Sequence, residues 1–351
     1  MKKIKLILVL LGVFFLTSLI IIYVVRRPSY TIQTNGKLYI VNKLSSNITI
    51  FDLYQGKVIN NELPINIEPH EATTLTNQQK VIVTNYGAPH VIGKSITVIN
   101  TETNKPEKII QLDESLRPHG IVAIPQSNKV VVVTDLSNDL LVVNVETGFV
   151  EKKIPTQQQF SHLLVLHPNK PLAYVTNINS NSVSVINLEQ DQVIKIIPCG
   201  LGAEGIDITP DGSEIWVSNN EENSISIIST DNHQVIDTLS AGKDPSRLKF
   251  SVDGSHCLVT NAADGTISVY NRYAKKLIKT ITIPGKKKLI EKILYKSPRP
   301  VAILTHPNGL YAFVANSNAN KIEVIDMQTF SIVSSIGTGK IPDGLAFVEE
   351  N

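Results

Sequence analysis

The sequence has few of the residues that form covalent scaffolds or recognisable catalytic motifs. Its only cysteines are Cys199 and Cys257, and two cysteines expected on opposite faces exclude a disulfide framework. It contains no Gly-x-Ser-x-Gly, no His-Glu-x-x-His and no phosphate-binding glycine loop. It also has no Cys-x-x-Cys-His for covalent haem attachment. The common sequence signatures of serine hydrolases, zinc proteases and nucleotide-dependent enzymes are therefore missing.

The chain also lacks a large excess of either positive or negative charge. The whole chain carries +2, but residues 1–27 hold five basic and no acidic residues, so the remainder carries −3. A strongly basic face is the usual electrostatic footprint of a nucleic-acid-binding protein. We therefore expect no nucleic-acid partner.

What the chain does have is a repeat. Seven β-branched runs end in related four-residue figures, and their valines lie 42, 50, 42, 42, 42 and 55 residues apart. A fixed period near 42 indicates stacked copies of one supersecondary unit. The figures are YIVN, IVTN, VVTD, YVTN, WVSN, LVTN and FVAN, ending at Asn42, Asn85, Asp135, Asn177, Asn219, Asn261 and Asn316.

Each unit predicts four short strands. In residues 205–239, four runs rich in isoleucine, valine and threonine are separated by Pro-Asp-Gly and asparagine-rich turns. Seven four-stranded units of this length predict an all-β, seven-bladed β-propeller over residues 37–351. Trp216 and Tyr174 are expected in blade cores, and His167 and His306 at the surface of one rim.

The repeat also predicts how the ring closes. Residues 37–41 form a second strand without a first strand before it, whereas residues 344–348 form a first strand with no blade after it. We expect residues 344–348 to complete the blade built from residues 37–63, which would pair both free strand edges.

The N-terminus predicts a membrane anchor. Lys2, Lys3 and Lys5 precede twenty mostly apolar residues, 6–25, and Arg26-Arg27-Pro28 ends the run. Twenty residues at about 1.5 Å each span a bilayer core of roughly 30 Å. A cleaved signal peptide is the alternative, although its apolar region is usually shorter and ends in small residues. We expect an uncleaved anchor in residues 1–27, a linker in residues 28–36, and a single-pass protein whose monomeric propeller lies outside the cytoplasm.

The repeat resembles a known family. Tyr174-Val175-Thr176-Asn177 is the literal signature of YVTN-type propeller repeats, and the other six copies are similar to it. The resemblance covers roughly residues 37–348 and implies a seven-bladed, often exported propeller, mostly of unassigned activity. Sugar-lactone hydrolases and haem-carrying nitrite reductases are propellers of more distant similarity. Fold alone does not choose among these activities.

Two insertions depart from the 42-residue period, and both fall on the same predicted face. Residues 86–94 enlarge the loop after the second strand of blade 2, and residues 285–299 enlarge the loop entering blade 7. Insertions on one face are typical of a binding face. The second insertion predicts a short amphipathic helix, either a solvated surface helix or a docking element for an anionic ligand, with basic residues Lys286, Lys287, Lys288 and Lys292.

The third difference between the repeated units lies at the mouth of the predicted central channel. Alignment of the loops entering the inner strands places three histidines and a glutamate on neighbouring blades, a set that suits a divalent metal. The alternative is structural, with each imidazole bonded to backbone of a neighbouring blade. One equivalent position holds His70, His119, His162, Glu204, Ser246, Val301 and Asp343 around the ring.

Two functions follow from these patterns. The first is a membrane-anchored binding module that presents its insertion-bearing face to a protein or an anionic small molecule. The second is a lactone-type or metal-assisted hydrolase at the channel mouth. In the hydrolase, His119 or His162 would act as base, Glu204 and Asp343 as ligands or acids, and Arg117, Arg247 and Arg299 would bind an anion. A haem would need one of the same histidines as its axial ligand.

Overall fold

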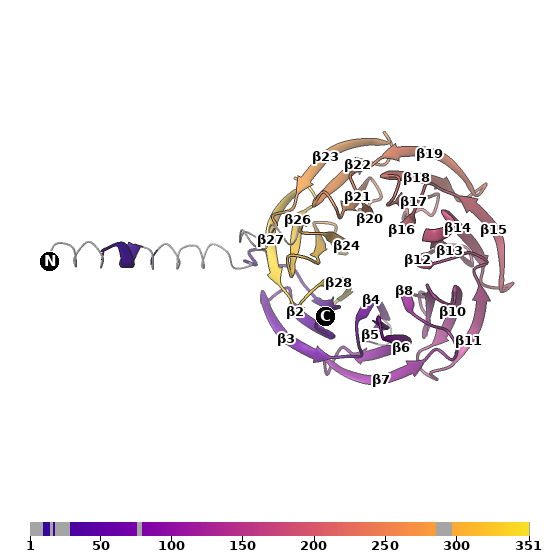
Figure 1. Ribbon diagram of the computed structural model, residues 1–351, viewed down its shortest axis with the longest axis horizontal. Helices are drawn as coiled ribbons and strands as arrows, with labels where there is room; N and C mark the ends of the chain where they lie inside the picture. Colours follow the sequence, from indigo (N-terminus) through magenta and orange to yellow (C-terminus); the bar gives the residue numbers. More distant parts are fainter. Residues whose placement is uncertain (1–9, 15–16, 18–28, 76–78, 286–296, 351) are drawn as a thin grey trace.

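The computed structural model describes residues 10–14, 17, 29–75, 79–285 and 297–350. Seven four-stranded antiparallel sheets form a ring around a central channel (Figure 1). The predicted all-β, seven-bladed propeller is therefore confirmed. Blade 1 has the order β28-β1-β2-β3, and blades 2 to 7 take β4–β7, β8–β11, β12–β15, β16–β19, β20–β23 and β24–β27.

The strands keep one role in every blade. The inner strands are β4 (Pro69–Leu75), β8 (Pro118–Ala123), β12 (Ser161–Leu166), β16 (Ala203–Ile208), β20 (Pro245–Phe250), β24 (Pro300–Thr305) and β28 (Pro342–Val348). The second strands are β1 (Lys37–Asn42), β5 (Lys80–Ala88), β9 (Lys129–Thr134), β13 (Leu172–Asn177), β17 (Glu214–Asn219), β21 (His256–Asn261) and β25 (Tyr311–Asn316).

The outer half of each blade follows the same pattern. The third strands are β2 (Asn47–Asp52), β6 (Val91–Asn100), β10 (Asp139–Asn144), β14 (Ser182–Asn187), β18 (Ser224–Ser229), β22 (Thr266–Asn271) and β26 (Lys321–Asp326). The outer strands are β3 (Lys57–Pro64), β7 (Lys105–Gln111), β11 (Val150–Pro155), β15 (Gln192–Pro198), β19 (Gln234–Ser240), β23 (Lys276–Thr282) and β27 (Ser331–Gly337). One short 3-10 helix, η2 (Ile178–Ser180), follows β13.

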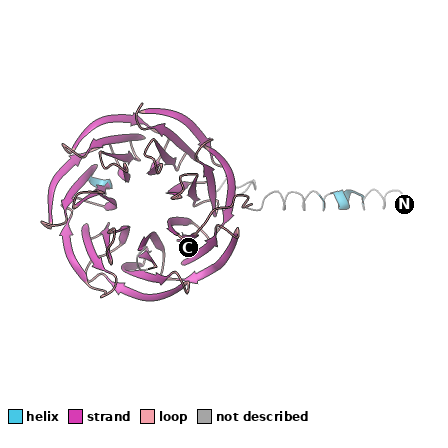
Figure 2. Ribbon diagram, turned by 180° about the vertical axis from the view of Figure 1, so that it is seen from behind, coloured by secondary structure: helices cyan, strands magenta, loops and turns pink. Residues whose placement is uncertain are grey.

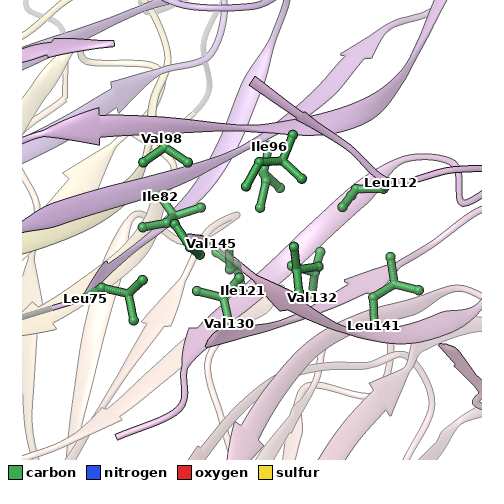
Figure 3. Packing of buried hydrophobic residues seen from close by; sticks show 12 residues of the cluster. Leu75, Ile82, Ile96, Val98, Leu112, Ile121, Val130, Val132, Leu141 and Val145 are labelled. Atoms are coloured by element: carbon green, nitrogen blue, oxygen red, sulfur yellow. The ribbon is translucent and has the colours of Figure 1, made fainter. Parts of the chain in front are cut away.

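The hydrophobic core lies between the blades rather than within them. The described residues form seven buried clusters, one at each seam between neighbouring blades. Figure 3 shows the cluster in which Ile82 and Ile96 of blade 2 meet Val132 and Leu141 of blade 3. Because sheets pack on both of their faces, second strands such as β13 are buried along their whole length. This explains why their sequences are continuous apolar runs.

The ring closes as predicted. Strand β28 pairs antiparallel with β1, with Leu38 opposite Phe347 and Ile40 opposite Leu345. The predicted pairing of residues 344–348 is confirmed, and the strand begins two residues earlier than expected. Figure 2 shows the closed ring from behind, with the C-terminus inside it.

A segment before the first strand adds a second closure. Ser29 and Thr31 bond with β27, where the Ser335 N–H donates to the Ser29 carbonyl at 2.9 Å and the Thr31 N–H donates to the Ser334 hydroxyl at 2.8 Å. The Tyr30 hydroxyl donates to the Leu53 carbonyl in blade 1 at 2.9 Å. Residues 29–35, named here the strap, therefore tie the last blade to the first.

The strap also corrects one expectation. His306 is buried, with 5% of its surface exposed, because Thr34 and the Asn35 carbonyl lie 3.2 and 3.0 Å from its Nε2. His167 is buried as well, and its Nδ1 accepts the N–H of Asn169. The prediction that both histidines lie at the surface was wrong, because each turns back to accept a turn N–H. Trp216 and Tyr174 are fully buried, as expected.

Of the predicted anchor, only residues 10–14 and 17 are described, and these are helical. Within the described part of the chain, no helix has the length and apolar character needed to cross a membrane. The predicted amphipathic helix, with Lys286, Lys287, Lys288 and Lys292, lies outside the described residues.

We predict that deleting residues 344–351 removes most of β28 and lowers the free energy of unfolding by more than about 4 kcal/mol, because blade 1 loses its inner strand and the ring opens. Thermal unfolding of purified protein measures the loss. Deletion of residues 349–351 alone is the matched control and should change the melting temperature little. Equal melting of the two truncated proteins would contradict the closure.

Candidate functional site at the channel mouth

Every inner strand carries a β-bulge at the candidate position. In blade 2, Pro69 pairs with Asn85 and Ala72 with Val83, so His70 and Glu71 together face Thr84. The ladder of all seven blades shifts at the equivalent point. A bulge re-aims side chains locally. Here it turns residues of seven strands toward one space.

That space is a cavity of about 390 Å³ on the face where the loops leaving the second strands open, named here the top face. All seven aligned positions line it, so the predicted convergence of the histidines, Glu204 and Asp343 is found. These positions are His70, His119, His162, Glu204, Ser246, Val301 and Asp343.

Three histidines form a stack along the cavity wall. The ring centroids of His70 and His119 are 4.0 Å apart, and those of His119 and His162 are 3.9 Å apart. All three side chains are buried. Burial lowers their pKa values well below the ordinary range, and Arg247 lowers all three further. The imidazoles are therefore neutral near pH 7.

The Nδ1 atoms of these histidines have no hydrogen-bond partner among the described residues. The predicted structural alternative, in which each imidazole bonds to backbone, is not seen for the Nδ1 atoms of His70 and His119, whereas a hydrogen bond with the Glu204 backbone of the next blade raises the pKa of His162. His70 Nδ1 lies 3.1 Å from Asp343 Oδ2 but outside hydrogen-bonding geometry, and its Nε2 lies 2.9 Å from Lys43 Nζ.

Arg247 forms the floor of the cavity. Its guanidinium donates to Glu71 Oε1 at 2.9 Å and to Glu204 Oε1 at 3.0 Å, thereby joining inner strands on opposite sides of the channel. One guanidinium between two carboxylates leaves a surplus negative charge in a buried site. Burial raises the pKa of Glu71 and of Glu204, and the positive charge of Arg247 acts in the opposite direction.

The same arginine divides the channel. Arg247 lines the upper cavity and also a second cavity of about 410 Å³ on the opposite side, whose walls are mostly apolar residues of β8, β12, β16 and β20. A candidate anion-binding residue from the sequence is thus already neutralised by two carboxylates. Its assignment to anion binding stays a prediction, and in this structure its guanidinium is engaged by Glu71 and Glu204.

The remaining basic candidates lie at the rim. Arg299 lines the cavity and approaches Asp244 at 3.4 Å, and half of its side chain is exposed. The Arg117 guanidinium lies 5.2 Å from the centre of the Tyr86 ring. Arg117 and Arg299 both have positive φ, at 59° and 54°.

This left-handed backbone recurs in the residue before each inner strand. Blade 5 has a glycine there, Gly202, and the other six positions carry side chains. Non-glycine residues adopt positive φ at a cost of order 1 kcal/mol, more for a β-branched one such as Ile341. Phe160, Arg299 and Ile341 of this set line the cavity. The loop geometry therefore places side chains at the mouth.

The sequence-based reasoning did not single out several residues of the site, among them Lys43, Glu71, Tyr86 and Asp135. The Tyr86 hydroxyl donates to Asp135 Oδ2 at 2.6 Å, and its ring meets His70 edge-on at 4.9 Å. A signal was present for Asp135, because it is the one aspartate among six asparagines that end the figures. Asn85, for comparison, donates to Ser95 and Thr97 within its own blade.

The insertion at residues 86–94 is a hairpin rather than a loop. Gly87 pairs with Ile92 and Ala88 with Val91, so β5 and β6 extend beyond the sheet and only Pro89 and His90 remain as the turn. The extension fixes Tyr86 at its base against the histidine stack. The hairpin thus supplies a wall of the cavity.

We predict that Asp135→Asn changes the pH dependence of stability. Burial raises the pKa of Asp135 to about 6, so its contribution is greatest below pH 4 and is lost as the pH rises through 6. Relative to wild type, Asp135→Asn should gain up to about 3 kcal/mol between pH 4 and pH 6 and level off above. Urea unfolding of both proteins measures the difference. A constant difference across this range would contradict the assignment.

Comparison with known proteins places this chain in a family. The model of the family "Lactonase, 7-bladed beta-propeller" matches residues 23–282, well over half of the chain. A functionally unknown protein from Desulfotomaculum acetoxidans DSM 771 is similar at 17% identity and a TM-score of 0.74, covering 90% of this chain and 100% of that one. Hydrazine synthase of Kuenenia stuttgartiensis is similar at 15% identity and a TM-score of 0.69, covering 83% and 92%. No curated protein sequence matches. At these identities the solved structures support the fold alone, whereas the family match shows that the chain belongs to the seven-bladed β-propeller lactonase family.

Proposed function

We propose that the protein is a binding module that takes a small anionic molecule into the top-face cavity. The observation that carries this proposal is the convergence, in one space of about 390 Å³, of the residues by which the blades differ. A volume of this size lies within the range of small-molecule sites. A cavity formed by side chains on strained backbone positions also fits a binding role better than a purely structural one.

Cations without a close carboxylate lie around the mouth and offer contacts to an anion, beside Asp135, Glu204 and Asp343, which line the same cavity. Within the described residues, Lys43 and Arg117 have no carboxylate at ion-pair distance. Arg299 has only a long, half-exposed contact with Asp244. A bound carboxylate would find these three cations around the opening, whereas Arg247 stays engaged below. Charge-assisted hydrogen bonds of this kind are stronger than neutral ones.

Membership in the lactonase family suggests the probe. A sugar lactone and the aldonic acid formed from it share hydroxyl groups, and the acid carries the carboxylate that the rim cations would bind. Gluconate and glucono-1,5-lactone therefore test the proposal, and the family match supports this choice of ligand class.

We predict that gluconate binds the full-length protein and raises its melting temperature, and that Lys43→Met weakens the binding at least about 10-fold by removing a charge-assisted contact worth about 1.5 kcal/mol or more. Titration calorimetry measures the affinity. Lys94→Met, an exposed lysine on the neighbouring hairpin, is the matched control and should bind as wild type does. Absence of binding by gluconate and the lactone, or equal weakening in both variants, would contradict the site.

A second function, hydrolysis of the lactone, is favoured by one observation. Neutral, buried His119 and His162 line the same cavity, and a general base needs an unprotonated ring nitrogen. Acid release from glucono-1,5-lactone, followed with a pH indicator, separates the two. Turnover above the uncatalysed rate that is lost in His119→Ala supports the hydrolase, whereas binding without turnover supports the module alone.

We also propose that residues 6–25 hold the propeller on the outer side of a membrane, without cleavage. The support is the length and apolar character of that segment in the sequence. Mass spectrometry of protein extracted from membranes should find residues 1–27 attached. A mature protein beginning at or after Arg27, released into the medium, would show a cleaved signal peptide instead.

A further inference from the structure

The strongest feature that ligand binding does not use is a set of nitrogen and oxygen donors in the cavity wall. His70, His119 and His162 are 8%, 2% and 6% exposed, and their Nδ1 atoms lack hydrogen-bond partners among the described residues. Buried polar atoms are satisfied in the large majority of cases, because an unsatisfied one destabilises the fold. Three such atoms side by side need a physical account.

The donors are of the chemical type that a metal takes. Each imidazole holds a ring nitrogen, Nδ1, that no described residue engages. Neutral imidazole together with carboxylate is the donor set that zinc and similar divalent ions accept in open sites.

The geometry narrows the set. One donor atom from each of His70, Glu71 and His119 lies within 4.8 Å of the other two. Zinc bonds of about 2.0–2.2 Å place tetrahedral donors roughly 3.3–3.5 Å apart, so the three must close by about an ångström or more. All three extend from the bulges of neighbouring strands β4 and β8, so the site would close by rotation of these side chains.

We propose that His70, Glu71 and His119 bind one divalent transition-metal ion such as zinc, leaving a fourth position open toward the top-face cavity. The ion would satisfy a nitrogen of each imidazole and take the carboxylate oxygen that Arg247 leaves free. His162 stacks on the far side of His119 and stays outside the site. Glu204 is also outside, because Arg247 and the Asn220 amide engage it.

Lys43 should have opposite effects on the two kinds of binding: it should favour an anion and disfavour a metal ion. Its Nζ lies 2.9 Å from His70 Nε2, where it occupies a ring nitrogen and repels a cation. Lys43→Met removes both effects. The same substitution that weakens gluconate binding should therefore strengthen metal binding, which separates the two proposals.

The test is a titration of full-length, chelator-treated protein with Co²⁺ alone, followed by visible d–d absorption and competition with Zn²⁺. We expect one ion per chain, tighter binding by Lys43→Met, and a loss of more than about 100-fold in affinity in His119→Ala and in Glu71→Gln, since even outer-shell partners of a metal contribute 10- to 100-fold. Glu71→Gln keeps the shape of the side chain, so it guards against a folding defect that His119→Ala could introduce.

His162→Ala is the matched control, because it removes a histidine of the same stack and burial without touching the three donors. It should bind Co²⁺ within about threefold of wild type. Three outcomes would overturn the proposal: no cobalt spectrum, unchanged affinity in folded Glu71→Gln and His119→Ala, or a loss in His162→Ala that His119→Ala does not show. Gluconate plays no part in this titration, so failure of the ligand proposal leaves it unaffected.

Discussion

The close approach of neighbouring inner strands is the constraint on which the rest of this propeller depends. The bulge in each inner strand interrupts the ladder, and in blades 2, 4 and 6 a threonine hydroxyl fills the gap. Thr84 accepts the Glu71 N–H at 2.9 Å and donates to the His119 carbonyl of the next blade at 3.1 Å. Thr176 repeats the arrangement with Leu163 and Glu204, and Thr260 repeats it with Arg247 and Val301. In these three blades, the third residue of the repeated figure thus hydrogen-bonds one blade to the next.

Glycine completes this contact where two strands come closest. A Cβ at Gly344 would lie 2.4 Å from the His70 carbonyl oxygen, and one at Gly120 would lie 2.8 Å from that of His162. A side chain cannot fit at these two points, and the residues just before them, His119 and Asp343, line the cavity.

The architecture could be predicted from the sequence because the periodicity of apolar residues and the turn residues are local signals. Valine spacing and Pro-Asp-Gly turns predict blades, and the unpaired runs at residues 37–41 and 344–348 predict closure. The loop alignment also predicted which histidines meet. The contacts made inside the ring could not be predicted in this way. The span of Arg247 to Glu71 joins residues 176 positions apart, and nothing in either local sequence specifies its partner.

Backbone conformation explains part of what was missed. Lys43 and Tyr86 directly follow the repeated figure, and left-handed residues in the loops entering the inner strands place Phe160 and Ile341 in the same cavity. Backbone conformation of this kind is not visible in a pattern of apolar and polar residues, since arginine, phenylalanine and isoleucine occupy positions that usually favour glycine. The candidate site therefore includes positions where local backbone preference is overridden.

The strap has a mechanical consequence. Ser29 and Thr31 lie along β27, and Tyr30, which packs edge-on against Phe51, reaches into blade 1. Any pulling force applied to the N-terminal end of the chain therefore enters the ring at the seam between its last and first blades. Several hydrogen bonds along one strand would have to fail together under such a load, rather than one after another. The protein thus carries these extra contacts at the joint where its ring closes.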